Sequence, residues 1–389
     1  MNVDVAIIGG GLVGGSLAVA LADAGVSVAL VDASSAAEPA QTIVSGFDQR
    51  VFALRPASRQ FLHACGIWRH VDEARVAPVY RMLVTGDDGT SRLTFDAYRS
   101  GIAELAVIAE NSVLHSAVRS ALGERDLVTC LPGRRCEGVR WEGEAVTVSL
   151  DNGAEIQAQL IVAADGANSR VRELAGIEVR QSVYGHSAVV ANFRASISHD
   201  GTAWQWFRPD GVLALLPLPG QHVSMVWSTQ QDHADELMCL DAGQLAARVT
   251  DVSNGVAGVL SSDGAAAMFP LRLMRAASVV GPRLALVGDA AHNVHPLAGQ
   301  GLNLGLGDAQ SLALAVARRG PDEAGSSAVL ARYRRSRAEE TMAMAFATDG
   351  LHRLFQSSAP GVAWLRNTGL RLTERFAPLK SILVKHAAG

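Results

Sequence analysis

The sequence predicts an α/β fold in which a nucleotide-binding parallel sheet is interrupted by an inserted, mostly antiparallel β-sheet and followed by a helical C-terminus. Three observations predict it. The chain opens with an apolar run, a glycine-rich turn and a helix of small residues. Strand-like runs separated by Gly and Pro fill residues 180–273, and much of the chain beyond residue 303 has helical patterning.

The first 32 residues are expected to form a strand, a helix and a second strand. Residues 3–8 are apolar throughout, as in a buried parallel strand, and Gly9, Gly11 and Gly14 then form the pattern G-x-G-x-x-G. In this fingerprint the first glycine makes the turn, the second admits a pyrophosphate and the third lets helix and strand approach. Asp32 ends the second strand, where an acidic side chain accepts from ribose hydroxyls. Together these features favour a Rossmann-like site over an ordinary glycine-rich turn.

The later elements are predicted in the same way. Strands are expected where apolar or alternating runs end at turns, and helices where apolar residues recur at helical spacing. Strands are expected within residues 77–98, 105–109, 127–150 and 158–164, and helices begin near residues 58, 111 and 303.

Residues 284–303 are the most informative segment. They read as an apolar strand ending in Asp289, then a glycine-containing loop, then a helix that begins near Gly301. A carboxylate at a strand end, followed by backbone N–H groups at a helix N-terminus, suits a ligand with hydroxyls at one end and an electron-rich ring at the other. A flavin with its ribityl chain is such a ligand, so the two ends of the chain together predict FAD.

Composition excludes several classes of protein. The formal net charge of −4 gives no general attraction to nucleic acid. The four cysteines are scattered, and the spacing of Cys130 and Cys136 fits no zinc site, so no metal is expected and all four thiols are expected to be structural. No signal peptide and no apolar stretch of about 20 residues is evident, which predicts a cytoplasmic protein that is at most peripheral to the inner membrane.

These motifs, in this order, resemble the FAD-dependent aromatic hydroxylases of the p-hydroxybenzoate hydroxylase superfamily, and more closely the flavin hydroxylases of ubiquinone biosynthesis. The resemblance covers essentially the whole chain. Its most specific part is the run His-Pro-Leu-Ala-Gly-Gln-Gly-Leu-Asn at residues 295–303. Other carriers are Asp48-Gln-Arg50, Asp165-Gly166, Asp308, Tyr333 and Arg337.

The resemblance implies roles for individual residues. The glycine fingerprint and Asp32 would hold the ADP half of FAD, Asp289 would accept from the ribityl hydroxyls, and backbone N–H groups of residues 301–303 would face the flavin pyrimidine edge. The expected cofactor residues are Gly9, Gly11, Gly14, Asp32, Arg50, Asn111, Asp165, Asp289, Gly301, Leu302 and Asn303. The expected catalytic residues, where substrate and O2 would meet the ring, are His295, Pro296 and Gly299.

Some of these assignments have alternatives. Arg50 lies beside the flavin or is a surface arginine, and Asn111 binds cofactor or only begins a helix. Asp165 contacts NAD(P)H, which otherwise lacks a site, or is a strand–helix cap. His292 and His295 assist deprotonation of a phenol or are hydrogen-bonded structural residues.

The activity that the resemblance implies is monooxygenation. NAD(P)H reduces FAD, O2 adds to give a C4a-hydroperoxide, and an electron-rich phenol ring attacks its distal oxygen. The expected substrate is a small aromatic molecule, a polyprenyl-phenol intermediate of ubiquinone biosynthesis. Alternatives are a flavoprotein hydroxylase or oxidoreductase acting on another aromatic substrate, and a non-catalytic flavin-binding scaffold of a quinone-biosynthesis complex. Ring position, tail length, NADH versus NADPH and oligomeric state are left open.

A halogenase is a further candidate, because residues 204–209 match the W-x-W-x-x-P pattern of flavin-dependent halogenases. Those enzymes depend on an active-site lysine, whereas the only lysines here are Lys380 and Lys385. The halogenase is therefore rejected. Trp204 and Trp206 are expected to line an apolar pocket or to pack the sheet.

The domain boundaries follow from these patterns. A discontinuous FAD-binding domain is expected over residues 1–76, 104–179 and 274–350, a substrate domain over 77–103 and 180–273, and a C-terminal helical segment over 351–389. That segment mixes apolar and basic side chains. It would lie on a membrane as an amphipathic helix, or pack on the FAD domain or on a protein of a quinone-biosynthesis complex.

Overall fold

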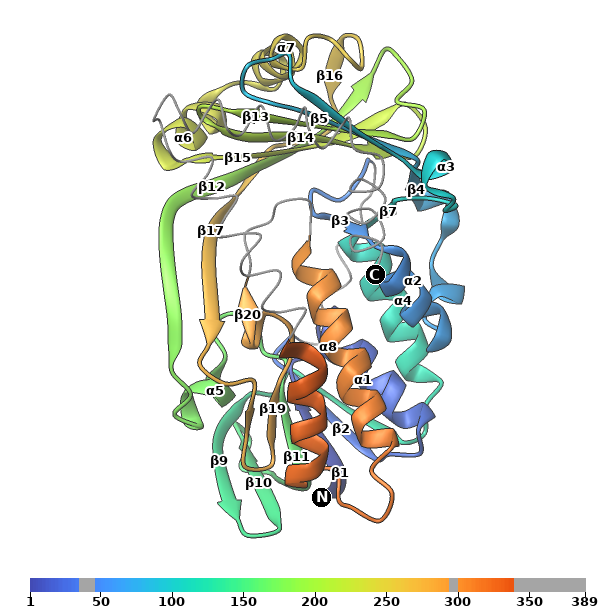
Figure 1. The fold of residues 1–389 in the computed structure, drawn as a ribbon. Coiled ribbons are helices and arrows are strands. Elements are labelled where there is room, and N and C mark those ends of the chain that lie inside the picture. The colour runs from blue at the N-terminus through green and yellow to red at the C-terminus, as the bar shows by residue number, and fades with distance from the viewer. Residues whose placement is uncertain (35–45, 294–299, 339–389) are drawn as a thin grey trace.

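The computed structural model describes residues 1–34, 46–293 and 300–338, and Figure 1 shows their arrangement. An eight-stranded sheet lies near the N-terminus and a nine-stranded sheet lies at the opposite end of the molecule. A three-stranded antiparallel sheet completes the set, formed by β3 (Val51–Leu54), β7 (Ala106–Glu110) and β4 (Val76–Val79). The predicted fold class is confirmed.

The eight-stranded sheet has a parallel centre. Its strand order is β18-β19-β11-β1-β2-β8, with the hairpin β9–β10 added antiparallel to β11. The strands are β1 (Asn2–Ile8), β2 (Val28–Asp32), β8 (Val128–Pro132), β9 (Cys136–Glu142), β10 (Ala145–Leu150), β11 (Glu155–Ala163), β18 (Val280–Gly281) and β19 (Leu284–Leu286).

Alternation along β1 shows how the sequence fills both faces of this sheet. Val5 and Ile7 pack in the core shared with the helices α1 (Leu12–Asp23), α2 (Pro56–Ala64), α4 (Asn111–Gly123) and α8 (Gln300–Ala317). Ala6 and Ile8 pack on the other face, against the β9–β10 hairpin and α5 (Arg170–Leu174). Successive side chains of a strand point to opposite faces, so a continuous apolar run is what a strand covered on both faces needs.

The nine-stranded sheet has the order β20-β17-β12-β15-β14-β13-β5-β6, with β16 beside β12. It is antiparallel except where β13 pairs parallel with β5. The strands are β5 (Arg81–Thr85), β6 (Arg92–Asp96), β12 (Val179–Ala195), β13 (Thr202–Arg208), β14 (Gly211–Leu218), β15 (His222–Gln230), β16 (Leu260–Ser262), β17 (Ala267–Ala276) and β20 (His292–Asn293). The long strands β12 and β17 run from this sheet toward the parallel sheet.

Two helices cover the outer face of the nine-stranded sheet, α6 (Gln231–Cys239) and α7 (Ala242–Val252). Strands and turns were expected across this region, and these two helices were not. Asp241 begins α7 with a capping box, accepting from the Gln244 backbone N–H at 2.8 Å. Leu245 and Val249 then bury one apolar face against the sheet. Four short helices, α3 (Ala97–Ser100), η1 (Trp68–His70), η2 (Glu73–Arg75) and η3 (Gly288–Ala290), and a helix described over residues 327–338 complete the described fold.

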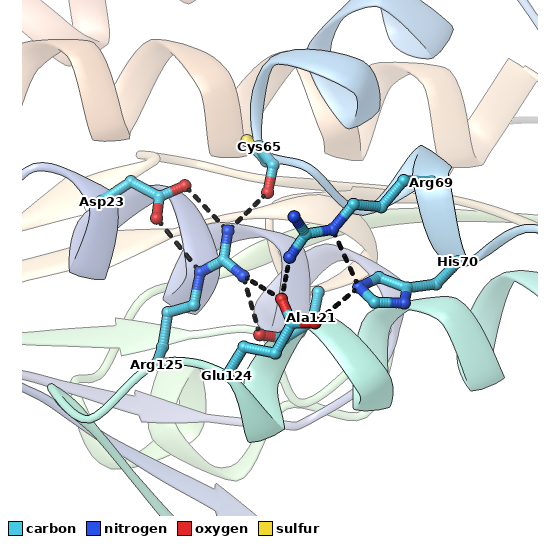
Figure 2. Close-up of polar contacts among 7 residues, drawn as sticks. All are labelled: Asp23, Cys65, Arg69, His70, Ala121, Glu124 and Arg125. Atoms are coloured by element: carbon cyan, nitrogen blue, oxygen red, sulfur yellow. Dashed lines mark hydrogen bonds and ion pairs between the residues drawn. The ribbon is translucent and has the colours of Figure 1, made fainter.

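A polar network joins the C-terminal ends of α1, α2 and α4, at the edge of the core that these helices share with the parallel sheet (Figure 2). The Arg125 guanidinium donates to Asp23 Oδ1 at 3.1 Å, to the Cys65 carbonyl at 3.0 Å and to Glu124 Oε2 at 2.9 Å. Arg69 donates to the same Glu124 oxygen. Arg125 therefore links the C-terminal ends of three helices, one of which, α1, begins at the glycine turn.

In the part of the chain that the structure describes, no helix is long and apolar enough to cross a membrane. Residues 351–389 and the two lysines lie outside the described residues. The division into domains stays a prediction.

Candidate active site

The glycine turn between β1 and α1 forms a tight cradle. Gly9 has a φ of 109°, and a Cβ built on it would lie 2.2 Å from the Ala164 carbonyl oxygen. A Cβ on Gly14 would lie 1.9 Å from the Gly9 carbonyl oxygen, so any side chain there would force helix and strand apart. A Cβ on Gly11 would meet nothing within 4 Å. Two of the three glycines are therefore required for packing, and the third leaves open space at the start of α1.

Asp32 lies directly behind this turn, at the end of β2. Its Oδ1 accepts from the Ser34 backbone N–H at 3.0 Å, and its Oδ2 would lie 2.5 Å from a Cβ built on Gly10. The carboxylate thus touches the glycine turn, the position from which a ribose would be held.

A cavity of about 520 Å³ extends from the open side of the turn to the nine-stranded sheet. Six of the predicted cofactor residues line it: Gly11, Arg50, Asn111, Asp289, Gly301 and Leu302. Gly9, Gly14, Asp32, Asp165 and Asn303 do not line it. His295, Pro296 and Gly299 lie outside the described residues.

The loop that carries Arg50 is fixed by its neighbours. Asp48 accepts from the backbone N–H groups of Arg50 at 2.9 Å and Ser112 at 3.0 Å. The Asn111 N–H donates to the Arg50 carbonyl at 2.9 Å, which ties the start of α4 to this loop. Arg50 and Asn111, both predicted from the sequence, are thus adjacent at the mouth of the cavity.

A partly buried ion pair that was not predicted from the sequence supports the same loop. Glu110 is fully buried, receives two hydrogen bonds of 2.7 Å from the Arg75 guanidinium, and accepts from the Asp48 N–H at 2.6 Å. Asn192 of β12 donates its amide to the carbonyls of Phe47 and Asp48 at 3.1 and 3.0 Å. The loop is therefore held between the three-stranded and nine-stranded sheets. Pairs separated by tens of residues leave no periodic signal in the sequence.

Asp289 lies on the short helix η3 after β19, half-buried in the cavity wall. Burial raises the pKa of its carboxyl group, and this rise is opposed by the charges of Arg50 and His292. A carboxylate beside open space can accept hydrogen bonds from ligand hydroxyls.

A second buried group lies beneath Asp289, centred on Asp308 of α8. Asp308 Oδ2 accepts from the Gly288 N–H at 2.9 Å and lies 2.8 Å from His292 Nε2, while Oδ1 accepts from Arg337 Nε at 2.6 Å. Asp308, His292 and Arg337 are each at most 4% exposed. Of the two interpretations of His292, the geometry favours the buried structural residue. The resemblance included Asp308 and Arg337 but gave them no role.

The remaining predicted residues have structural partners. Asp165 Oδ2 accepts from the N–H groups of Arg170 and Val171 at 2.7 and 3.2 Å, so this carboxylate caps α5. The Asn303 amide bridges α8 to the β3 segment, accepting from the Arg55 N–H at 2.9 Å and donating to the Ala53 carbonyl at 2.8 Å. These contacts fix the Asn303 side chain to the β3 segment.

The first turn of α8 completes the cofactor side of the cavity. Gly301 and Leu302 line it, and N–H groups in the first turn of a helix have no partner within the helix. Their partial positive charge favours an anionic or electron-rich group. Within the described ranges, no group of three or more His, Cys, Asp or Glu side chains could hold a metal ion.

The open glycine turn, Asp289 and the α8 N-terminus are donor and acceptor groups that fit FAD. Comparison with known proteins gives the same cofactor. Residues 2–348 match the family model described as FAD binding domain, which confirms the predicted cofactor.

The curated relatives match along nearly the whole chain. Ubiquinone hydroxylase UbiL of Rhodospirillum rubrum is 36% identical over 388 residues, covering 99% of this chain and 89% of that protein. The 3-demethoxyubiquinol 3-hydroxylase of Escherichia coli is 36% identical over 389 residues, covering 99% and 98%. The mouse ubiquinone biosynthesis monooxygenase COQ6 is 33% identical over 434 residues, covering 99% and 90%.

Solved structures share the fold at lower identity. PqsL of Pseudomonas aeruginosa, a probable FAD-dependent monooxygenase, has a TM-score of 0.80 at 24% identity, covering 96% of this chain and 100% of that chain. A variant of Klebsiella pneumoniae HpxO complexed with FAD has a TM-score of 0.74 at 19% identity, covering 100% and 99%. The predicted resemblance is thus confirmed: this chain belongs to the FAD-binding-domain family, among the FAD-dependent monooxygenases related to the ubiquinone-biosynthesis hydroxylases.

Proposed function

We propose that this protein hydroxylates the ring of a polyprenyl phenol of ubiquinone biosynthesis. In the overall reaction NAD(P)H, a proton, O2 and the aromatic C–H give NAD(P)⁺, water and the ring hydroxyl. The observation that carries the proposal is a cavity with polar groups that suit a cofactor at one end and an apolar sheet face at the other. The names of the relatives supply the substrate class.

In this proposal each part of the cavity wall has its own task. FAD, once reduced by NAD(P)H, supplies the activation of O2. The open space at Gly11 admits the pyrophosphate, Asp289 accepts from the ribityl hydroxyls, and the α8 N-terminus faces the electron-rich edge of the ring. Asp32 holds the ribose from behind the glycine turn. The apolar strands beyond them exclude water and bury the phenol ring.

Two glycine variants test where the cofactor binds. Gly11→Ala places its methyl group in open space, at a φ of −65° that alanine adopts freely, so the apoprotein should keep its melting temperature. It should lose FAD affinity by about tenfold or more, because the methyl group occupies the space of the pyrophosphate. Gly14→Ala, by contrast, should unfold at lower temperature. Flavin fluorescence titration and thermal unfolding separate the two, and wild-type affinity in the Gly11 variant would contradict the proposed cradle.

The reaction is tested with the FAD-loaded protein, by following NADPH and NADH oxidation with and without a short-chain prenylphenol. Stimulated oxidation and a product heavier by one oxygen are expected. Flavin binding with no hydroxylated product from any prenylated phenol would overturn the proposed substrate class.

We also propose that the C-terminal segment brings the enzyme to the membrane in which a polyprenyl tail resides. Its mixture of Leu, Ile, Val and Phe with Arg and Lys supports this. Liposome binding by the full chain and by a chain that ends at residue 361 should differ. Equal binding by both would refute the idea.

A further inference from the structure

The strand β13 presents two different faces. Trp204 and Trp206 pack in the apolar core between the nine-stranded sheet and the helices α6 and α7. Gln205, between them, therefore points to the opposite face, where it lines the cavity. The tryptophans thus pack the sheet, and the glutamine is the residue of this motif that a ligand can reach.

The surroundings of Gln205 are apolar. On the strands β12 to β15 the cavity is lined by the aliphatic residues Ala188, Val190, Val212, Ala214, Leu216 and Val226. Gln205 and Ser228 are the polar lining residues of these four strands. A ring packed on such a wall is held by burial but can rotate in its own plane, since dispersion and hydrophobic contacts are not directional.

Neither polar side chain has a hydrogen-bond partner in the described part of the chain. Gln205 is 7% exposed and Ser228 is 5% exposed. Burying an amide or a hydroxyl without a partner is costly, so buried polar groups are nearly always paired. The polar atoms of Gln205 and Ser228 are not fully enclosed by protein but open onto the cavity, where water or a ligand with complementary oxygens can pair with them.

The register gives their separation. Gln205 pairs with Ala214, Ala214 pairs with Val226, and Ser228 lies two residues beyond Val226 on β15. Two strand spacings and two residue rises place the Cα atoms of Gln205 and Ser228 roughly 12 Å apart. Because both side chains leave the same face, an oxygen-substituted ring can lie between them with a hydrogen bond toward each side.

From this geometry we infer that Gln205 is a specificity-determining residue that hydrogen-bonds an oxygen substituent of the aromatic substrate, with Ser228 contacting a second substituent. The inference rests on the proposed function and deepens it. A ring held at two points cannot rotate, so these contacts select the ring carbon that is presented to the flavin. The Gln205 amide suits this role because it donates and accepts without changing charge.

The test uses FAD-loaded protein and three single variants. Gln205→Leu and Ser228→Ala remove the polar groups, and Gln221→Leu makes the same change at an exposed position in the turn between β14 and β15. Binding of a short-chain prenylphenol and of the prenylbenzene that lacks its oxygen is measured by the change in flavin absorbance. Product positions are determined by NMR, and thermal unfolding verifies that each variant is folded.

Wild-type protein should prefer the prenylphenol by about tenfold or more, and Gln205→Leu should lose most of this preference while keeping its affinity for prenylbenzene. Hydroxylation should spread over more than one ring position in Gln205→Leu and in Ser228→Ala. Gln221→Leu should behave as wild type. An unchanged preference and a single unchanged product in Gln205→Leu, with active wild-type protein, would overturn the inference. Wild-type protein that hydroxylates no prenylphenol would instead overturn the proposed function, and this inference with it.

Discussion

Replacing Asp308 by Asn should destabilise the protein severely, although the two side chains have nearly the same shape. The carboxylate is 1% exposed and neutralises two buried cations, Arg337 at 2.6 Å and His292 at 2.8 Å. Removing one partner of a buried ion pair leaves an uncompensated charge and costs about 3–5 kcal/mol. Since a folded domain is stable by only about 5–15 kcal/mol, this loss would be a large fraction of the total.

Urea unfolding of the apoprotein measures this cost directly. Asp151→Asn, an identical change at an exposed turn, should shift the unfolding free energy by less than about 0.5 kcal/mol. The double variant Asp308→Asn/Arg337→Met removes a charge of each sign and should recover part of the loss. A loss below about 1 kcal/mol in Asp308→Asn would refute the reasoning, because the carboxylate would then not be compensating buried charge.

The same group predicts a pH dependence. Burial alone would lower the pKa of His292, but the charge and close approach of Asp308 raise it above 6.5. A histidine whose pKa is raised in the folded state stabilises the protein below pH 6.5. This stabilisation is lost as the pH rises through the raised pKa. Burial alone would raise the pKa of Asp308, but His292, Arg337 and the Gly288 N–H lower it below 3.8. The contribution of Asp308 to the unfolding free energy is present above pH 3.8 and is lost as the pH falls through its lowered pKa. His292→Asn should therefore flatten the alkaline decline in unfolding free energy, and an unchanged decline would contradict the assignment.

Three further outcomes are expected. Burial raises the pKa of the Cys65 thiol to about 12, so native protein should react with a thiol reagent at the exposed Cys130 and Cys239, and at Cys65 only after unfolding. Arg125→Ala should cost about 1–2 kcal/mol by releasing three helix ends, whereas Arg69→Ala, at a side chain 60% exposed, should cost far less in the same urea titration. Glu110→Gln should lower the unfolding free energy by about 1–3 kcal/mol and weaken FAD binding, because the loop that carries Arg50 loses its support. An unchanged flavin titration would contradict this.

Features set by local backbone geometry could be predicted from the sequence. The spacing of Gly9 and Gly14 predicted a turn that only glycine fits, and the structure gives the contacts that exclude a side chain at each. The apolar run that ends at Asp289 predicted a strand and a polar terminus, since both follow from neighbouring residues. The helices α6 and α7 were not predicted, although the capping box of Asp241 and the helical spacing of Leu245 and Val249 are local signals of a helix.

Features set by distant partners could not be predicted. Asp308 and Arg337 are 29 residues apart in sequence, and Asp48 and Glu110 are 62 apart. Each pair meets only because separate elements pack together, and no periodicity records that. Asp165 is the intermediate case: its position predicted either a helix cap or a ligand contact. Its Oδ2 caps the α5 backbone, whereas its Oδ1 is buried without a hydrogen-bond partner among the described residues, so a ligand contact stays a prediction.

The Trp204-Gln205-Trp206 motif shows how packing between distant elements decides which side chain a ligand can reach. Alternation places the two tryptophans on one face of β13 and the glutamine on the other, and this follows from the sequence alone. Which face borders the cavity depends on where α6 and α7 pack, because the helices cover the tryptophan face and leave Gln205 on the face that lines the cavity. A bulky aromatic pair that resembles a halogenase pattern thus packs the sheet on the covered side. The residue between them, which carried no signal of its own, lies where a substrate ring would be oriented.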